Sequence, residues 1–377
     1  MRTDWVKREF DACIEKRKAP TKLLSSSYQE KGLFPIVSQE KVLISGYWDN
    51  PEDLFVHKKP VVVFGDHTMV VKYIDFDFVV GADGVKILEP KDFLLPKFFF
   101  YWVSSVKIKS RGYARHYRYL RDAFVPVPSL LEQQRIVEIL DLEFAKIDAL
   151  KANAEKSIQA TKDLFQATLT KELEPKDGWK MVKMGDYFRI TSSKRVFQAD
   201  WTDKGVPFYR AREIVKLAKY GSVDNDLFIT PEMYDTYKKK YGVPKVGDIL
   251  ITGVGTLGVC FLVENETPFY FKDGNVIWFQ KEKEISSRYV IHCYQTNAVK
   301  EQVHSTQGAV VGTYTIEKAN ATTIPLPPTI ELQEVLASRL DDLSVKCQVL
   351  QDNYQKTLTL CDDLKQALLR KAFKGEL

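Results

Sequence analysis

The chain has 377 residues, 45% hydrophobic and 28% charged, which is the composition of an ordinary folded protein with room for two or three domains. Its net charge of +5 is too small to indicate a polyanionic partner by itself. Five scattered cysteines without a CxxC spacing argue against a disulfide framework and a structural zinc site, and no signal peptide or membrane-spanning run is present, so we expect a cytoplasmic protein.

The first predicted domain covers residues 1–128 and mixes short strands with a short helix. VVVF from Val61 and FDFVV from Phe76 are typical of strands, whereas FLLPKFFFYWVSSVKI from Phe93 is typical of a short helix. The stretch GDHTMVVKYID supplies the candidate contacts His67, Thr68 and Lys72.

The strongest local signal is KIKSRGYARHYRYLRD, residues 107–122, in which basic and aromatic residues alternate and no carboxylate precedes Asp122. A basic run is more often a solvated face than a binding site. The interleaved aromatics nevertheless favour DNA contact, because Arg and Lys neutralise phosphates and Arg can fork onto guanine. The candidate contacts are Lys109, Arg111, Tyr113, Arg115, His116, Tyr117 and Arg118.

Two long helices are predicted, over residues 129–173 and 329–377. The second has a heptad seam of apolar residues at Leu336, Leu340, Leu343, Cys347, Leu350, Tyr354, Thr357, Cys361, Leu364 and Leu368. The first repeats it 200 residues earlier but places Glu143, Ser157 and Thr161 on the seam. Two unrelated surface helices are the alternative, yet equal length and register favour pairing.

The linker between the halves, residues 174–178, is short and contains Pro175 and Gly178. The second domain, residues 179–328, must therefore begin where the first helix ends, so we expect the two helices to run antiparallel with a domain at each end. Each helix should be roughly 65 Å long at about 1.5 Å per residue.

The second domain is expected to contain strands at DILIT, from Asp248, and VIWF, from Val276, and a short helix at RYVIHCYQTNAVKEQV, from Arg288. Its segment HSTQGAVVGTYTIEK, residues 304–318, is the counterpart of the basic cluster but has hydroxyl and amide groups that could read base edges. The candidate contacts in this domain are Arg210, Arg212, Thr252, Thr256, Thr306, Gln307, Thr313 and Tyr314.

The glycines of GVGTLG, at 253, 255 and 258, have the spacing of a dinucleotide-binding fingerprint. Such a site needs a helix after the third glycine, whose first amides hold the pyrophosphate. VCFLVENETPFYF follows here and predicts a strand, so we expect a strand–turn–strand whose glycines serve close approach to DNA or only a tight hairpin. No P-loop, GxSxG, HExxH or amino-methylation motif was found, which indicates a binding protein.

The two halves of the sequence repeat each other. Pro126, Pro128, Glu132 and Gln134 match Pro325, Pro327, Glu331 and Gln333. KGLFPIVSQE from Lys31 parallels KGVPFYRARE from Lys204, and VVGADGVKIL from Val79 parallels FYFKDGNVIWF from Phe269. Gly65 stands near where Gly247 stands in the second half. We therefore expect an α+β protein with an internal pseudo-twofold repeat of two mixed-sheet domains and two long helices.

These segments resemble the specificity subunit of type I restriction-modification systems over essentially the whole chain. The resemblance rests on GDHTMVVKYIDFDFVVGADGVKIL, GYARHYRYL, VPVPSLLEQQRIVEIL, TLTKEL, GWKMVKMGDYF, GDILITGVGTLG, IPLPPTIELQEVL and KQALLRKAFKGEL. The first domain begins almost at residue 1, with Trp5 where Trp179 opens the second, so no N-terminal extension is expected to help close the ring of repeats.

The resemblance implies two target-recognition domains on an antiparallel coiled coil, each reading one half of a split, asymmetric DNA target while the helices set the spacer. It implies no catalytic centre and no cofactor on this chain. Two methylase subunits using S-adenosylmethionine and motor-nuclease subunits using ATP and Mg would be its partners, and methylase packing could cover the polar seam positions. The alternatives are a duplicated coiled-coil scaffold without DNA binding and, on the glycines alone, a nucleotide-dependent enzyme.

Overall fold

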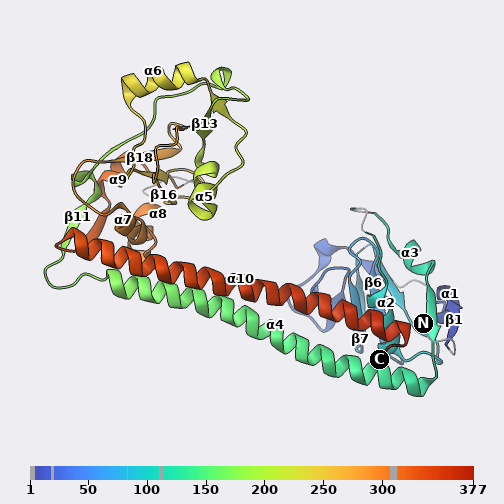
Figure 1. Ribbon diagram of the computed structural model, residues 1–377. Helices are drawn as coiled ribbons and strands as arrows, with labels where there is room; N and C mark the ends of the chain where they lie inside the picture. The colour runs from blue at the N-terminus through green and yellow to red at the C-terminus, as the bar shows by residue number, and fades with distance from the viewer. Residues whose placement is uncertain (1–4, 18–20, 83, 110–111, 113, 306–311) are drawn as a thin grey trace. The chain divides into compact units, whose positions relative to one another are not determined.

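The computed structural model describes residues 5–17, 21–82, 84–109, 112, 114–305 and 312–377 (Figure 1). The chain divides into two compact units, Met1–Lys156 with Tyr354–Leu377, and Ser157–Asn353. Each unit holds one strand-rich domain and parts of both long helices, which confirms the α+β class. In this described part of the chain, no helix is both long and apolar enough to span a membrane.

The first domain forms small sheets around a strongly apolar strand. Its strands are β1 (Val6–Glu9), β2 (Lys22–Leu23), β3 (Phe34–Val37), β4 (Gly46–Trp48), β5 (Leu54–Phe55), β6 (Val61–Gly65), β7 (Val71–Ile74), β8 (Phe78–Gly81), β9 (Val85–Leu88) and β10 (Phe124–Val127). Its short helices are α1 (Phe10–Cys13), α2 (Pro96–Ser105) and α3 (Tyr117–Arg121). Every residue of β6 is buried, as expected for a β-branched strand covered on both faces.

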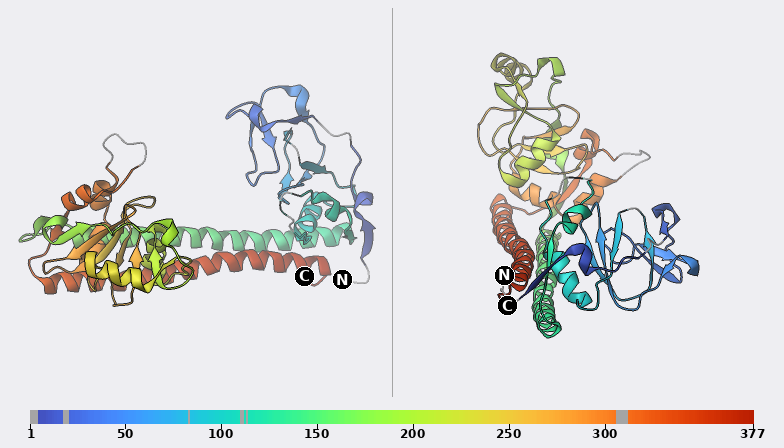
Figure 2. Two further views of the ribbon diagram at one scale, coloured as in Figure 1. Left: turned by 90° about the horizontal axis from the view of Figure 1, so that it is seen from above. Right: turned by 90° about the vertical axis from the view of Figure 1, so that its right-hand side faces the viewer.

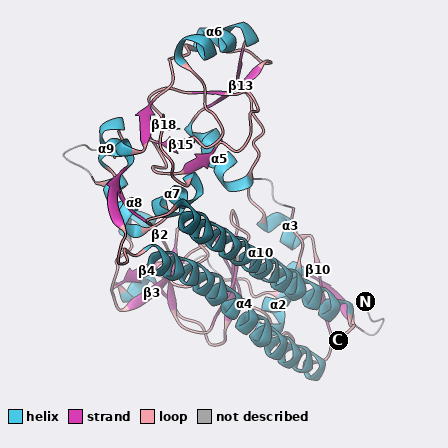
Figure 3. Ribbon diagram, turned by 60° about the vertical axis from the view of Figure 1, so that its left-hand side comes forward, coloured by secondary structure: helices cyan, strands magenta, loops and turns pink. Residues whose placement is uncertain are grey.

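The second domain is built in the same way. Its strands are β11 (Lys180–Lys183), β12 (Phe188–Thr191), β13 (Val206–Tyr209), β14 (Phe228–Ile229), β15 (Ile249–Thr252), β16 (Cys260–Leu262), β17 (Tyr270–Phe271), β18 (Val276–Lys281) and β19 (Thr323–Leu326). Its short helices are α5 (Ala211–Tyr220), α6 (Pro231–Tyr241), α7 (Ser287–Tyr294), α8 (Asn297–His304) and α9 (Ile316–Ala321). Figure 3 shows these helices around the strands.

Strand pairing confirms the internal repeat. In the first domain β6 lies antiparallel between β7 and β9, and in the second β15 lies antiparallel between β16 and β18. The parallel pair β3 and β8 matches the parallel pair β13 and β17. The first and last strands of each domain also pair, β1 with β10 and β11 with β19. Helices α5 and α6 lie in a long excursion of the second domain between β13 and β15.

One predicted element is divided in the structure. The single helix expected from Arg288 is two helices, α7 and α8, which break at Gln295. The cause is Thr296, whose side chain accepts a hydrogen bond from the amide of Val299 and so caps a new helix. The strands predicted at Val61, Asp248 and Val276 and the helix predicted at Phe93 are present as β6, β15, β18 and α2.

The long helices are α4 (Leu130–Leu173) and α10 (Ile330–Lys374), and within each unit they lie side by side (Figure 2). In the first unit Lys151 pairs with Asp362 at 2.6 Å and Lys365 with Asp148 at 2.5 Å. One partner rises in number as the other falls, so the predicted antiparallel pairing is confirmed. In the second unit the same register brings Gln166 and Cys347 to one small hollow.

The predicted heptad seam is buried at both of its positions at the start of each helix, where Ile136 and Leu336 enter a domain core, but at only one position farther along. Residues that recur every seven positions are buried in both helices, at Leu140, Ile147, Ala154, Thr161, Leu340, Cys347 and Cys361. The alternate leucines are exposed: Leu150 by 54%, Leu164 by 56%, Leu350 by 44% and Leu364 by 48%. The helices therefore contact each other along a narrow line and leave these four leucines of the second row uncovered.

The last turns of both long helices enter a domain core instead of continuing the seam. Leu169 and Leu173 of α4 are buried with the second domain, and Leu369 and Phe373 of α10 are buried with the first. These pairs are related by the same offset of 200 residues. At this end of α10 the buried residue is therefore Leu369 and not the predicted Leu368, because the end of the helix turns its buried face towards the domain.

A buried glutamine fixes the start of each long helix. Gln133 accepts from the amide of Leu95 at 2.8 Å, and Gln333 accepts from the amide of Ser286 at 2.9 Å. The match of Gln134 with Gln333 is therefore wrong. Pro328 adds one residue between the Pro-x-Pro segment and the second helix, which makes Gln133 the true counterpart.

Candidate nucleic-acid interface

The basic cluster of the first domain is anchored to the turn between β6 and β7. Asp66, which is buried in this turn, accepts from the amide of His116 through its carbonyl at 2.8 Å and from the amide of Tyr117 through Oδ1 at 2.8 Å. The turn and the cluster, 50 residues apart in sequence, therefore form one surface. This brings together two of the segments selected from the sequence.

The cluster keeps several cations at its surface. Lys107, Lys109, Arg115 and Arg118 are exposed. The Arg118 guanidinium lies 4.6 Å from the ring centre of Tyr119, and its Nη2 donates to the Tyr119 hydroxyl at 2.6 Å. Arg121 is occupied differently, because its Nε donates to the Asp11 carboxylate at 3.0 and 3.1 Å. The predicted contacts Arg111 and Tyr113 lie outside the described residues.

Other selected side chains of this domain have partners within the protein. His116 is buried, and its Nδ1 lies 3.0 Å from the carbonyl of Asp66. Burial raises the pKa of Tyr117 to about 12, so its hydroxyl stays protonated at neutral pH. Their DNA contacts stay predictions, but the structure already accounts for these two residues as supports of the surface.

The turn residues also support a neighbouring loop. Lys72 is buried, and its ammonium donates to the carbonyls of Ser38 at 2.8 Å and Val42 at 2.5 Å. Thr68 Oγ1 donates to the carbonyl of Gln39 at 2.6 Å, and the amide of His67 donates to the Gln39 side chain at 3.2 Å. The geometry gives Lys72 and Thr68 the role of holding loop 38–43 against the β6–β7 turn.

The glycine turn of the second domain is a strand–turn–strand, as predicted. It joins β15 to β16, and no helix follows Gly258. Thr252 is buried and its Oγ1 bonds the carbonyl of Thr256, so the threonines close the turn on itself. Gly65 is the last residue of β6 and Thr252 is the last residue of β15, so Gly65 corresponds to Thr252 and Asp66 to Gly253, which corrects the approximate match of Gly65 with Gly247.

Two different structural constraints account for the three glycines of this turn. Gly255 and Gly258 have φ of 77° and 76°, which side chains rarely adopt. A Cβ on Gly253 would lie 2.8 Å from the carbonyl oxygen of Tyr314. The close approach at Gly253 is thus to the protein's own segment 312–315, whose Tyr314 amide donates to the Gly253 carbonyl at 3.0 Å.

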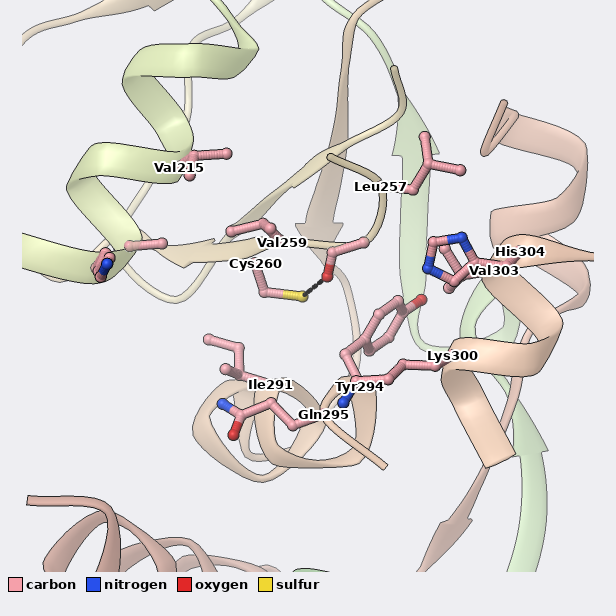
Figure 4. A pocket seen from close by; sticks show the side chains of 13 residues that line it. Val215, Leu257, Val259, Cys260, Ile291, Tyr294, Gln295, Lys300, Val303 and His304 are labelled. Atoms are coloured by element: carbon pink, nitrogen blue, oxygen red, sulfur yellow. Dashed lines mark hydrogen bonds between the residues drawn. The ribbon is translucent and has the colours of Figure 1, made fainter. Parts of the chain in front are cut away.

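Beneath this turn lies a cavity of about 370 Å³ (Figure 4). Its lining is mostly apolar, with Val215 from α5, Ile291 from α7 and Val303 from α8, and Cys260 points its sulfur towards the carbonyl of Gly258 at 3.5 Å. Burial raises the pKa of the Cys260 thiol. Without a helix start beside the glycines, this cavity offers no cradle for a pyrophosphate.

The remaining candidates of the second domain differ in availability. Tyr314 is buried, with its hydroxyl 2.8 Å from that of Tyr294 and 2.7 Å from Thr322 Oγ1, while Thr313 is half-buried. The predicted contacts Thr306 and Gln307 lie outside the described residues. The hydrogen bond from the Tyr314 amide to the Gly253 carbonyl mirrors the hydrogen bond from the His116 amide to the Asp66 carbonyl, so the described residues 312–315 correspond to the part of the basic cluster around His116.

Arg210 and Arg212 form part of an acidic–basic cluster. Arg210 Nε donates to the buried carboxylate of Glu213 at 3.0 Å, and both arginines reach Asp226 at 2.8 Å. Their charge is thereby largely neutralised within the protein. Arg212 keeps more than half of its side chain exposed, so its predicted DNA contact stays open to test.

One basic segment was missed in the sequence. PEMYDTYKKKYG places Lys238, Lys239 and Lys240 between tyrosines at the end of α6. The criterion of interleaved basic and aromatic residues that selected residues 107–122 would have found it.

Comparison with known proteins places the chain in a family. It matches the type I restriction modification DNA specificity domain over residues 3–160 and 176–359. A putative type I restriction enzyme specificity subunit of Haemophilus influenzae is 28% identical over 177 residues, 45% of this chain and 44% of that protein. The EcoBI specificity subunit of Escherichia coli is 26% identical over 371 residues, 88% of this chain and 75% of that protein.

The fold agrees with these relatives. A chain solved in work on complex assembly and conformational transition of the type I R-M system has a TM-score of 0.72 at 15% identity, covering 100% of this chain and 99% of that one. Specificity subunits recognise DNA and are non-catalytic. The protein described here belongs to the type I restriction-modification DNA specificity family.

Proposed function

We propose that this chain reads a split, asymmetric DNA target, one half with each domain, and carries no catalytic centre of its own. The observation that carries the proposal is that the two domains place unlike segments on one scaffold. Segment 107–121 is basic and aromatic, whereas segment 304–318 is nearly uncharged, yet both bond to the turn after the central strand. Two different surfaces, carried on the same arrangement of strands, suit two different DNA half-sites.

In the first domain, Arg115 and Arg118 are the best-placed candidates for base reading, because both are exposed and Arg118 is held by Tyr119. Replacing Arg118 by Ala should cost about 1–3 kcal/mol at one half-site and leave the other unchanged. The measurement is fluorescence anisotropy on targets mutated in either half.

Arg118→Lys is the matched control for that experiment. It keeps the charge but loses the planar fork, so a phosphate contact survives it and a bidentate base contact does not. Equal weakening on every DNA sequence would demote Arg118 to a phosphate contact.

The long helices are proposed to set the unread spacer and to dock two copies of one methylase subunit. Leu150 and Leu364 are exposed beside the Lys151–Asp362 pair in the first unit. Leu164 and Leu350 are their equivalents in the second unit, by the offset of 200 residues. Two equivalent apolar patches suit two copies of one partner.

Docking can be tested with charged replacements. Leu150→Asp combined with Leu364→Asp should reduce the complex from two methylase copies to one, as counted by native mass spectrometry. Leu142→Asp is the control, because Leu142 is equally exposed but its equivalent is Asp342, so it belongs to no repeated patch. A complex that keeps both copies in the double variant contradicts this docking site.

The cofactors of the proposed assembly would belong to its partners: S-adenosylmethionine to the methylase subunits, and ATP and Mg to motor-nuclease subunits. Among the described residues of this chain, no three acidic, Cys or His side chains lie close enough together to hold a metal ion. We propose that the assembly works in the cytoplasm, where the five free thiols remain reduced.

A further inference from the structure

Helix α6 of the second domain carries a cationic surface that the recognition segments do not explain. The helix begins at Pro231 after the cap Thr230 and ends at Tyr241, where Gly242, with a φ of 81°, is the C-terminal cap. Its last turn holds Lys238, Lys239 and Lys240, all exposed. Cations at this end favour the helix dipole, yet one would suffice for that purpose.

The α6 surface is fixed rigidly to the rest of the domain. Tyr237 donates through its hydroxyl to the carbonyl of Arg195 at 3.1 Å, and its ring packs on Tyr270 at 5.3 Å. The hydroxyl of Tyr270 in turn accepts from the amide of Lys194 at 2.9 Å. Segment 194–195 is therefore held against the helix.

This contact adds a fourth cation to the surface. Lys194 lies 5.7 Å from the ring centre of Tyr241, and Lys240 lies 5.4 Å from the same ring. Tyr241 is 41% exposed and both lysines are exposed, so part of an aromatic side chain and two flanking ammonium groups are open to solvent together. We call Lys194, Lys238, Lys239, Lys240 and Tyr241 the α6 patch.

The charge of the α6 patch is not neutralised internally. Across the described part of the chain, no ion pair involves any of its four lysines. Neighbouring cations behave differently: Arg195 pairs with Asp273 at 2.8 Å, and Arg212 pairs with Asp226 at 2.8 Å. Free, clustered lysines beside an exposed tyrosine match a flexible polyanion.

The location also fills a gap in the second domain. The first domain has a cluster of surface cations in segment 107–121, but the corresponding segment 304–318 contains few cations. Helix α6 lies in the excursion between β13 and β15, where the first domain has only a short 3-10 turn, Pro51–Asp53, and no α-helix among its described residues. The second domain thus has a cluster of unpaired lysines on an added element.

We propose that the α6 patch binds the phosphate backbone of DNA, with Tyr241 packed against the sugar-phosphate chain, and supplies the sequence-independent part of binding by the second domain. This inference rests on the proposed DNA-reading function. Because lysine meets phosphate as a point charge, the patch adds affinity and salt dependence without selecting bases.

The test is the salt dependence of DNA binding by the full chain with its methylase partner. Lys238→Gln, Lys239→Gln and Lys240→Gln are combined, because Gln keeps helix propensity and length. The slope of log affinity against log salt should become shallower by about one unit for each lysine that contacts a phosphate. Affinity should fall by the same factor for the target and for DNA with either half mutated.

The matched control removes equal charge elsewhere in the same domain, as Lys180→Gln, Lys183→Gln and Lys283→Gln, and should leave the slope unchanged. A triple α6 variant with the original slope overturns the inference, and so does a changed base preference. A parent complex without any target preference would contradict the proposed function instead. Circular dichroism checks that α6 remains folded.

Discussion

The two domains share their strand pairing, a buried glutamine that anchors the start of one long helix, and a core completed by the last turn of the other long helix. They differ in the elements on which they cluster positive charge. The first has its cluster of cations in segment 107–121, beside the central turn, and the second has a lysine cluster on α6. The shared parts are those that bury apolar surface or satisfy backbone groups. Recognition chemistry has therefore varied where the frame does not constrain it.

We call the burial of the last turn of each long helix in a domain core the clasp. Substitutions in the clasp are the strongest test of the features that the two domains share. Phe373→Ala should cost about 3–5 kcal/mol and loosen only the first domain, where Phe373 packs edge-on against Phe98 at 5.2 Å. Leu173→Ala should cost about 2–5 kcal/mol and loosen only the second. Hydrogen exchange followed by mass spectrometry reports on both domains in one molecule.

The control for the clasp is Leu364→Ala, on the exposed row of α10, which should change stability by about 0.5 kcal/mol or less. Loosening of both domains by either core variant would show that the frames are not independent.

The anchoring glutamines should have a smaller effect. Gln133→Leu leaves the amide of Leu95 and the carbonyl of Phe93 without partners, and should cost about 1–3 kcal/mol. Gln333→Leu should act equally on the second domain through Ser286. Gln134→Leu is the comparison, because Gln134 is exposed and only bonds Glu138, and urea unfolding should hardly register it.

The smallest difference concerns pH. Asp341 on α10 bonds His292 at 2.7 Å, whereas the equivalent Asp141 on α4 accepts from Tyr101. Burial lowers the pKa of His292 below its ordinary 6.5, although Asp341 acts to raise it. The unfolded chain therefore takes up the proton first, and the second domain should lose stability as pH falls below about 6.5 through the lowered folded value.

Amide hydrogen exchange, measured at about pH 7.5 and pH 5.5 and corrected for intrinsic rates, should show this loss of stability at the lower pH in α7 and not in α2. His292→Tyr, which copies the first domain, should remove the difference. An equal response of both helices would assign the pH effect to other groups.

Much of the frame follows from sequence because it repeats. Pro-x-Pro segments, apolar strands and a period of seven predict the two domains and the helix pair. The single-residue insertion at Pro328 is invisible to pattern, since Gln133 and Gln134 are both glutamine, and only the hydrogen bond to Leu95 separates them. The division of α7 from α8 depends on one threonine cap.

The site is harder to predict because partners distant in sequence decide whether a polar side chain is available. Lys72 was selected as a cation, yet its ammonium is occupied by carbonyls about 30 residues away. Arg210 was selected likewise, and Glu213 and Asp226 neutralise it. Residue type indicates what a side chain could bind, while burial and neighbours decide whether it is free.

The clasp also has a consequence for synthesis on the ribosome. Leu169 and Leu173 emerge just before the second domain that they complete, whereas Leu369 and Phe373 emerge about 240 residues after the first domain that needs them. At about 5–20 residues per second, this delay is on the order of ten to fifty seconds. The part of the protein made first is thus the last to be completed, and its apolar core stays partly open to solvent during that interval.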